Sequence, residues 1–258
     1  MNDILNEIVE NKKKEVEQLK RQRPLSYLQK RIARQRPPLN FSRALAGNKT
    51  KIIAEVKKAS PSKGDLNPNL DHVEIARIYE KGGAAAISVL TESRYFKGSI
   101  DYLAQIKKAV NIPLLRKDFI FDPYQIYEAR AYGADAVLLI VAITEQGLLS
   151  GLIKLARNLD LDCLVEVHNA EELERAIDSK AKIVGINNRN LKTFNVDIDT
   201  TKHLLPLIQQ DTITISESGI RSGDDIKKLN KWKVNAALIG ESLVTADDAL
   251  AKLREFVL

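Results

Sequence analysis

The chain contains eight short apolar runs that recur along its length, with longer segments of helical character between them. Each run has four to six residues and is rich in Val, Ile and Leu, which is typical of strands buried on both faces. Eight such strands joined by helices favour a closed parallel barrel. We expect the strands at Ile52–Lys57, Ala85–Leu90, Pro113–Lys117, Ala136–Ile140, Asp162–Val167, Ile183–Asn187, Thr212–Glu217 and Ala236–Ile239.

The segments between these runs carry the signals of helix ends. Asp71 followed by Glu74 resembles a capping box, and Gly82-Gly83 predicts the end of the same helix. The design is repeated from Asp122 to Gly133. An open doubly wound sheet is the alternative, but no run is followed by Gly-x-Gly-x-x-Gly. The sequence therefore predicts an α/β protein that folds as a single (β/α)8 TIM barrel.

The length of 258 residues, of which 44% are hydrophobic, suits one barrel domain over residues 1–258. Residues 1–48 precede the first run and have two amphipathic helical patterns, split near Pro24 and ended by Pro37-Pro38. A charged segment of this length is too short to bury a core of its own. We therefore expect an N-terminal helical extension that docks on the barrel.

The net charge of +6 comes entirely from the leading segment. Residues 1–51 contain 13 Lys and Arg against 5 Asp and Glu, whereas the remaining residues contain 27 against 29. The basic face of the first helix has no aromatic side chains on which bases would stack. We expect a solvated surface there and no nucleic-acid partner.

Several simple features bear on where the protein works. A single cysteine, Cys163, allows no disulfide within the chain and fits a reducing compartment. No leader peptide and no apolar segment of membrane-spanning length is apparent. We expect a soluble, cytoplasmic protein with no membrane partner. A monomer is the expected state, with a homodimer as the alternative.

Polar side chains gather at the predicted carboxyl ends of the runs, where barrel enzymes place their active sites. Glu55 and Lys57 are two residues apart in one strand and so share a face. Burying such groups costs several kcal/mol each unless they are paired or used. The ends of the other runs add Thr91, Glu92, Lys117, Glu166, Asn187, Arg189, Glu217 and Gly240, which together indicate a catalytic pocket.

The loops after the last two strands have the composition of an anion site. They contain Glu217-Ser218-Gly219-Ile220 and Gly240-Glu241-Ser242-Leu243. Barrel enzymes commonly bind a phosphate at these two loops, through backbone N–H groups that glycine leaves open to close approach. The predicted partner is a small phosphorylated molecule, bound at Ser218, Gly219, Gly240 and Glu241.

Motifs at seven of the eight strand ends follow one another along the chain. They are Ile53–Gly64, Leu90–Glu92 with Tyr95–Ser99, Leu115–Ile120, Leu164–His168, Gly185–Leu191, Glu217–Ile220 and Gly240–Leu243. In this order they resemble indole-3-glycerol phosphate synthases over essentially the whole chain. The resemblance implies a carboxy-lyase of tryptophan biosynthesis that needs neither a metal nor an organic cofactor. It implies conversion of 1-(2-carboxyphenylamino)-1-deoxyribulose 5-phosphate to indole-3-glycerol phosphate, with loss of CO2 and then water.

The implied reaction calls for general acid/base catalysis. Lys117 is the expected acid for ring closure, and we expect nearby charges to tune it toward useful acidity. Glu166 and Glu55 are the candidates for proton transfer during dehydration. Lys57 has two candidate roles, as an acid in that step or as a cation that holds the substrate carboxylate or phosphate.

Other residues are expected to bind or orient the substrate. Asn187 and Arg189 suit its hydroxyls and carboxylate, and Ser60 is a further candidate contact. Glu217 would repel a phosphate unless a cation pairs with it, for which we expect Lys57, so its role is to support the site. Phe96 and Phe119 either pack on the anthranilate ring, as the resemblance suggests, or fill the core.

Three expectations concern the surroundings of the site. We expect His168 to point away from Glu166 and to make local hydrogen bonds rather than bind a metal. The loop from Lys58 to Leu70, rich in Ser, Pro, Lys and Asn, is expected to be a mobile cover. The leading helices are expected to form part of the substrate roof, as the resemblance suggests.

Two alternatives share the phosphate loops. One is another phosphate-binding barrel enzyme, such as a sugar-phosphate isomerase, which would not require this set of lysines and glutamates. The other is a non-catalytic barrel that binds a phosphorylated metabolite while its acid and base groups are idle.

Overall fold

A closed barrel of eight parallel strands forms the centre of the computed structural model, which describes residues 4–191 and 193–257. The order around the barrel is β1, β10, β9, β8, β7, β6, β5, β4. The predicted (β/α)8 TIM barrel is confirmed, and each strand end lies within one residue of its expected position. The strands are β1 (Lys51–Val56), β4 (Ala86–Leu90), β5 (Leu114–Lys117), β6 (Ala136–Ile140), β7 (Asp162–Val167), β8 (Ile183–Asn187), β9 (Ile213–Glu217) and β10 (Ala236–Ile239).

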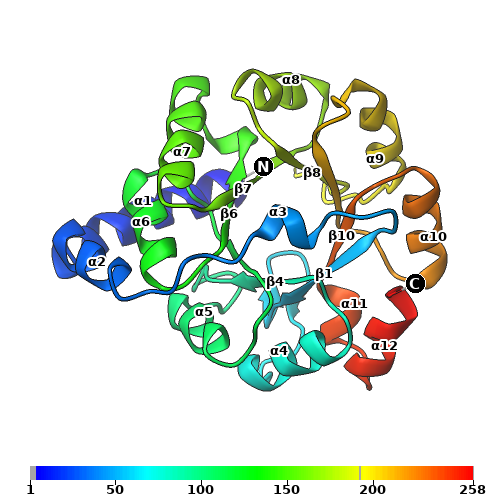
Figure 1. The fold of residues 1–258 in the computed structure, drawn as a ribbon, viewed down its shortest axis with the longest axis horizontal. Coiled ribbons are helices and arrows are strands. Elements are labelled where there is room, and N and C mark those ends of the chain that lie inside the picture. Colours follow the sequence, from blue (N-terminus) through cyan, green and yellow to red (C-terminus); the bar gives the residue numbers. More distant parts are fainter. Residues whose placement is uncertain (1–3, 192, 258) are drawn as a thin grey trace.

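Helices surround this barrel (Figure 1). Asp71 caps the first helix after β1 by accepting hydrogen bonds from the backbone N–H groups of Val73 and Glu74. Asp122 and Gln125 form a complete capping box. The helices are α4 (His72–Lys81), α5 (Ile100–Lys107), α6 (Pro123–Ala131), α7 (Gln146–Asn158), α8 (Ala170–Asp178), α9 (Asp199–Leu204), α10 (Gly223–Lys231), α11 (Glu241–Val244) and α12 (Ala249–Phe256), with short 3-10 turns at Val141–Ile143 and Leu205–Leu207.

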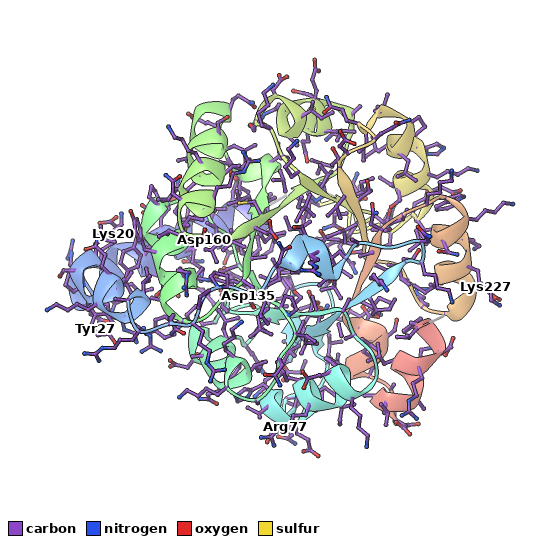
Figure 2. The ribbon with its side chains drawn as sticks, viewed as in Figure 1. Lys20, Tyr27, Arg77, Asp135, Asp160 and Lys227 are labelled. Atoms are coloured by element: carbon purple, nitrogen blue, oxygen red, sulfur yellow. The ribbon has the colours of Figure 1, made fainter. Side chains whose placement is uncertain are left out.

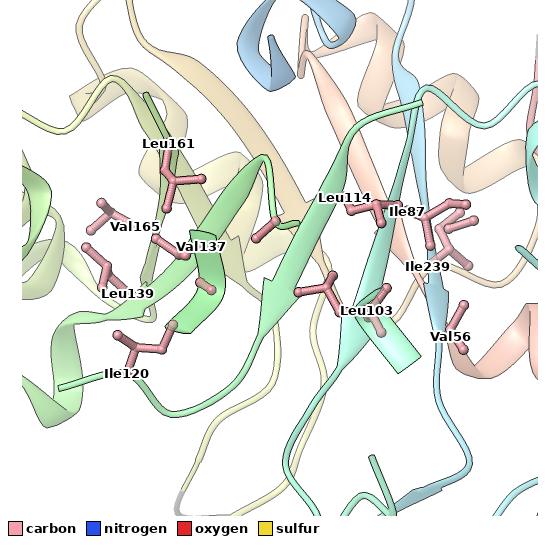
Figure 3. Close-up of a cluster of buried hydrophobic side chains, with 14 of the residues drawn as sticks. Val56, Ile87, Leu103, Leu114, Ile120, Val137, Leu139, Leu161, Val165 and Ile239 are labelled. Atoms are coloured by element: carbon pink, nitrogen blue, oxygen red, sulfur yellow. The ribbon is translucent and has the colours of Figure 1, made fainter. Parts of the chain in front are cut away.

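The strand alternation divides the core into two layers. Ile53, Leu115 and Leu164 point into the barrel and pack on one another. Residues of the opposite parity, such as Val137 and Val165, point outward and pack against the helices (Figure 3). The inner layer is apolar at the amino-terminal end and charged at the carboxyl end, so polar chemistry is confined to one mouth of the barrel.

The leading segment forms α1 (Ile4–Gln22), α2 (Leu25–Ile32) and α3 (Phe41–Ala44). It runs from α1 and α2 beside α6 to α3 across the middle of the barrel (Figure 1). Phe41 of α3 packs on the inner layer of the strands, and Ser42 N donates to Asp162 Oδ2 at 2.8 Å. The segment therefore closes the amino-terminal end of the barrel with α3, while α1 reaches the other mouth.

One element was absent from the expectations. The loop after β1, for which the sequence predicted a mobile cover, contains a two-stranded antiparallel sheet, β2 (Ala59–Ser60) with β3 (Gly64–Asp65). Gly64 has a φ of 66°, which the tight turn needs and which glycine adopts without strain. The loop is thus more regular than its polar composition indicated.

The helices carry their charges on the outer surface, where side chains such as Arg77 and Lys227 radiate from the ribbon (Figure 2). Within residues 4–191 and 193–257, no helix has the length and apolarity that a membrane crossing requires.

Candidate active site

A pocket lies at the carboxyl ends of the barrel strands. The residues expected to catalyse the reaction or to bind the substrate line it, whereas Thr91 and Glu92 do not. The strands supply the charged floor, the loops after β9 and β10 supply one rim, and α1 supplies apolar side chains to the wall. The predicted residues found there are Glu55, Lys57, Ser60, Phe96, Lys117, Phe119, Glu166, Asn187, Arg189, Glu217, Ser218, Gly219, Gly240 and Glu241.

Lys117, the last residue of β5, projects between two carboxylates. Its Nζ lies 3.2 Å from Glu166 Oε2 and 3.0 Å from Glu217 Oε2. Burial alone would lower the pKa of Lys117, but Glu217, Glu166 and Glu55 outweigh it and raise that pKa above its usual range. The expectation that neighbouring charges tune Lys117 toward acidity is therefore wrong for the unliganded site, because those neighbours are anions.

The two carboxylates that share Lys117 differ in their ionisation. Burial would raise the pKa of Glu166, but Lys117, His168 and Asn187 outweigh it and lower that pKa. Burial, with the neighbouring charge of Glu166, raises the pKa of Glu217 to about 7 despite the pull of Lys117. One carboxylate is thus held ionised, while the other changes protonation near neutral pH.

A second ion pair lies beside the first. Lys57 Nζ is 2.9 Å from Glu55 Oε1, as expected for residues that share a face of β1. The expectation that Lys57 pairs with Glu217 is wrong, since Lys117 takes that position. The reason is the strand parity, which places Glu55 closer to Lys57 than any carboxylate of β9. Lys57 therefore pairs with Glu55, and Lys117 pairs with Glu166 and Glu217.

His168 departs from the expectation as well. Its Nδ1 lies 2.9 Å from Glu172 Oε2, so the predicted local hydrogen bond is present. Its Nε2, however, lies 3.3 Å from Glu166 Oε1, an ion-pair distance without hydrogen-bond geometry. Residues two apart at a strand end share a face, so His168 points toward Glu166 and not away from it.

Stability should fall with rising pH because of His168. Burial disfavours the imidazolium, but Glu166 and Glu172 outweigh it and raise the pKa of His168 to about 10. A folded-state pKa above the unfolded value of about 6.5 stabilises fully below pH 6.5, and the effect is lost as the pH rises toward 10. Urea unfolding between pH 6 and 10 should show a loss on the order of a few kcal/mol. His168→Gln should remove most of this slope, and an equal slope in the variant would contradict the assignment.

Two glycines make room for the carboxylates. A Cβ on Gly240 would lie 2.3 Å from Glu55 Oε1, and a Cβ on Gly185 would lie 2.2 Å from Glu217 Oε1. Both distances are too short for any side chain to occupy without displacing the carboxylate. The sequence reasoning read Gly240 as a phosphate contact and overlooked Gly185, which has no polar group to attract notice.

Gly185→Ala should therefore disturb the charged floor of the pocket. The added methyl group would push Glu217 off Lys117, and a displacement of about 1 Å in such a site lowers kcat/KM by about 100-fold. Gly147→Ala in α7 is the matched control, since its Cβ would meet no atom within 4 Å. Steady-state kinetics of both variants give the comparison. Wild-type kinetics in Gly185→Ala would show that the Lys117–Glu217 contact is dispensable.

The predicted anion loops have strained backbone turned toward the pocket. Ser218 and Gly219 have φ values of 68° and 82°, in the left-handed region. A Cβ on Gly219 would lie 2.5 Å from Val196 Cγ1, so only glycine fits there. Gly240 immediately precedes α11, the short extra helix that barrel enzymes place beside a bound phosphate.

Cations surround these loops. Lys63 Nζ, from the loop after β1, lies 2.6 Å from Glu241 Oε1. Burial would raise the pKa of Glu241, but Lys63, Lys57 and Arg189 outweigh it and lower that pKa. These three cations hold Glu241 ionised and supply positive charge beside the loops.

Apolar side chains cover the charged floor. The rings of Phe96 and Phe119 lie 6.2 Å apart, centroid to centroid, with their planes tilted by 42°. Ile4, Leu5 and Ile8 of α1 line the same pocket. Sequence reasoning gave no residue numbers for this α1 contribution, because an amphipathic stripe does not reveal where it docks.

Buried charges tie α1 to the strand that carries Lys117. Lys12 Nζ lies 3.1 Å from Asp118 Oδ1, although the Lys12 side chain is only 2% exposed. Asp118 also accepts from Thr91 Oγ1 at 2.6 Å and pairs with Arg116 Nη2 at 3.1 Å. Lys12 was missed because it lies in a run of three lysines that appears fully solvated.

In the part of the chain that the structure describes, no group of three or more His, Cys, Asp or Glu side chains is placed so that it could bind a metal ion.

Solved structures with the same architecture belong to several proteins. The 3-hexulose-6-phosphate synthase of Salmonella typhimurium superposes with a TM-score of 0.65 at 12% identity, over 80% of this chain and 96% of that one. A thiamine phosphate pyrophosphorylase of Pyrococcus furiosus gives 0.62 at 17% identity, over 81% and 95%. These likenesses concern the fold alone.

Sequence relatives are much closer. An indole-3-glycerol phosphate synthase of Dehalococcoides mccartyi is 48% identical over 258 residues, 98% of this chain and 100% of that protein. One of Desulforamulus reducens is also 48% identical, over 98% and 97% of the two chains. The family model described as indole-3-glycerol phosphate synthase matches residues 5–256. The chain therefore belongs to the indole-3-glycerol phosphate synthase family.

Proposed function

We propose that Lys117, Glu166 and their neighbours carry out the family's reaction by general acid/base catalysis. That reaction closes the indole ring of 1-(2-carboxyphenylamino)-1-deoxyribulose 5-phosphate with loss of CO2 and then water, in tryptophan biosynthesis. The observation that carries the proposal is the buried Lys117 ammonium, set between two carboxylates on the pocket floor. The family assignment decides against the isomerase and against the idle binding barrel.

Ring closure requires a donor for the substrate carbonyl oxygen, which gains negative charge as the aromatic carbon attacks it. The raised pKa of Lys117 keeps it positively charged in the free site, so it stabilises the developing alkoxide first and then transfers its proton. Glu217, whose pKa is raised to about 7, is well suited to return that proton to Lys117. The ring nitrogen supplies the electrons for this attack. The bond to the carboxylate then breaks, and its electron pair restores the aromatic ring as CO2 leaves.

Dehydration then requires a base. The charge of Lys117 is the largest of the interactions that lower the pKa of Glu166, and His168 and Asn187 add to it. When Lys117 gives up its proton, this cation is lost and the basicity of Glu166 rises. The base therefore becomes effective after the acid has acted, which matches the order in which the reaction needs them. Asn187 Nδ2 donates to Glu166 Oε1 at 3.1 Å and keeps the carboxylate oriented.

The remaining residues of the pocket are proposed to bind the substrate. The loops at Ser218-Gly219 and Gly240-Glu241 hold the phosphate, with Ser60 and Arg189 beside them. Lys57 contributes positive charge at this end, because its field reaches Glu241 while Glu55 holds it in place. Phe96 and Phe119 pack on the anthranilate ring, whose carboxylate remains near the charged floor.

The decisive experiment adds the anilino-deoxyribulose phosphate to the purified protein and follows indole fluorescence. Indole-3-glycerol phosphate should accumulate with stoichiometric CO2. Formation of an isomerised sugar phosphate would support the isomerase instead, and binding without turnover would support the non-catalytic barrel. One chain supplies all the pocket residues, so the site needs no second subunit, and we propose that the protein is a monomer. Analytical ultracentrifugation measures its mass. We propose that it works in the cytoplasm.

A further inference from the structure

Asn188 lies directly beside the pocket residues Asn187 and Arg189 but faces the other way. Its side chain is 2% exposed and fully hydrogen-bonded. Nδ2 donates to Ser216 Oγ at 2.9 Å and to the backbone oxygen of Ser218 at 3.0 Å. Oδ1 accepts from Thr201, from N at 3.1 Å and from Oγ1 at 2.8 Å.

The bond to Ser218 determines where the next amide points. In a trans peptide unit, the C=O of one residue and the N–H of the next point in opposite directions. The Ser218 carbonyl is turned toward Asn188, behind the strand ends, so the N–H of Gly219 is turned the opposite way. Gly219 lines the pocket, and its N–H is therefore presented to the pocket side.

This orientation requires backbone that is otherwise unfavourable. Ser218 has a φ of 68°, a conformation that residues with a Cβ adopt rarely. A flip of this peptide unit would present the carbonyl oxygen to the pocket, where it would repel an anion. The Asn188 amide, with both donors in use, holds the peptide against that flip.

We propose that Asn188 is a positioning residue for the phosphate, which orients the Gly219 amide without touching the substrate. The proposal rests on the phosphate site assigned above to the Ser218-Gly219 loop. It predicts that loss of the Asn188 donors weakens the binding of phosphate-bearing ligands and leaves the chemical step nearly intact.

Asn188→Leu tests this, because Leu keeps the volume and removes the donors. KM for the substrate and the inhibition constant of inorganic phosphate should each rise roughly 10–100-fold, the range for a hydrogen bond to a charged group. The value of kcat should change by less than about threefold. A merely structural role would lower stability and leave these two constants unmoved.

Thr201→Val is the matched control. It removes the hydroxyl on the Oδ1 side of Asn188 but leaves both Nδ2 donors, so it should cost stability without changing either constant. Asn188→Ser keeps a polar side chain that is too short to reach the Ser218 carbonyl. It should show the same rise if Asn188→Leu does not fold.

The outcomes separate the two levels of the proposal. If inorganic phosphate does not compete with substrate in the wild-type protein, the phosphate site itself is assigned wrongly. If phosphate competes in the wild type and equally well in folded Asn188→Leu and Asn188→Ser, the site stands and the role of Asn188 is refuted.

Discussion

Lys117→Met should lower kcat by roughly a thousandfold or more, because it removes both the proton donor and the charge that stabilises the alkoxide. Since ring closure precedes decarboxylation, CO2 release and indole formation should be lost together. Single-turnover experiments that record both products measure this. Lys154→Met, an exposed lysine of α7, is the control for loss of one positive charge.

The same variant should reveal the electrostatics of the floor. Without Lys117, the buried carboxylates of Glu166 and Glu217 face each other with no shared cation, and both are then easier to protonate. The free energy of unfolding of the variant should therefore decrease more between pH 5 and pH 8 than that of the wild type does. Folded protein with near-normal turnover would remove Lys117 from its proposed role.

Glu166→Gln should separate the two halves of the reaction. Gln keeps the shape and the partner of Asn187 but accepts no proton, so dehydration should slow by about 100- to 10,000-fold. Ring closure depends on Lys117, so the first turnover should still release CO2. A burst of CO2 followed by slow indole fluorescence is the expected signature.

Glu172→Gln provides the comparison, since Glu172 contacts the same His168 but does not line the pocket. Its two products should appear together at close to wild-type rates. If CO2 and indole are delayed equally in Glu166→Gln, Glu166 acts in ring closure and the assignment of the base is wrong.

The fold was predictable from sequence because each strand carries its own local signal. Runs such as Ala136–Ile140 are apolar on both faces, and a strand buried on both faces has few other possibilities. The position of the pocket followed, because parallel strands bring their carboxyl ends to one edge of the barrel. Period-two alternation also predicted that Glu55 and Lys57 lie on one face of the first strand, where they form an ion pair.

What failed depends on contacts between distant segments. The partner of Glu217 is Lys117, a hundred residues away, and nothing local in either strand specifies it. The raised pKa of Lys117 follows from anions on three other strands, so its own sequence neighbours gave the wrong direction. Asn188 was not predicted because its side chain points away from the pocket. Its role depends on hydrogen bonds to Ser216 and Ser218, which lie far from it in the sequence.

The Lys12–Asp118 ion pair also bears on the order in which the protein is made. A ribosome synthesises α1 first, yet Asp118 and the oxygen of Asp122 that binds Lys20 Nζ at 2.7 Å follow about a hundred residues later. Until then the apolar stripe of α1, including Ile8 and Val16, has no surface to cover it. Nascent chains shorter than this should present that stripe to chaperones. The first helix to be translated therefore completes its docking only after the first three strands of the barrel, β1, β4 and β5, have been made.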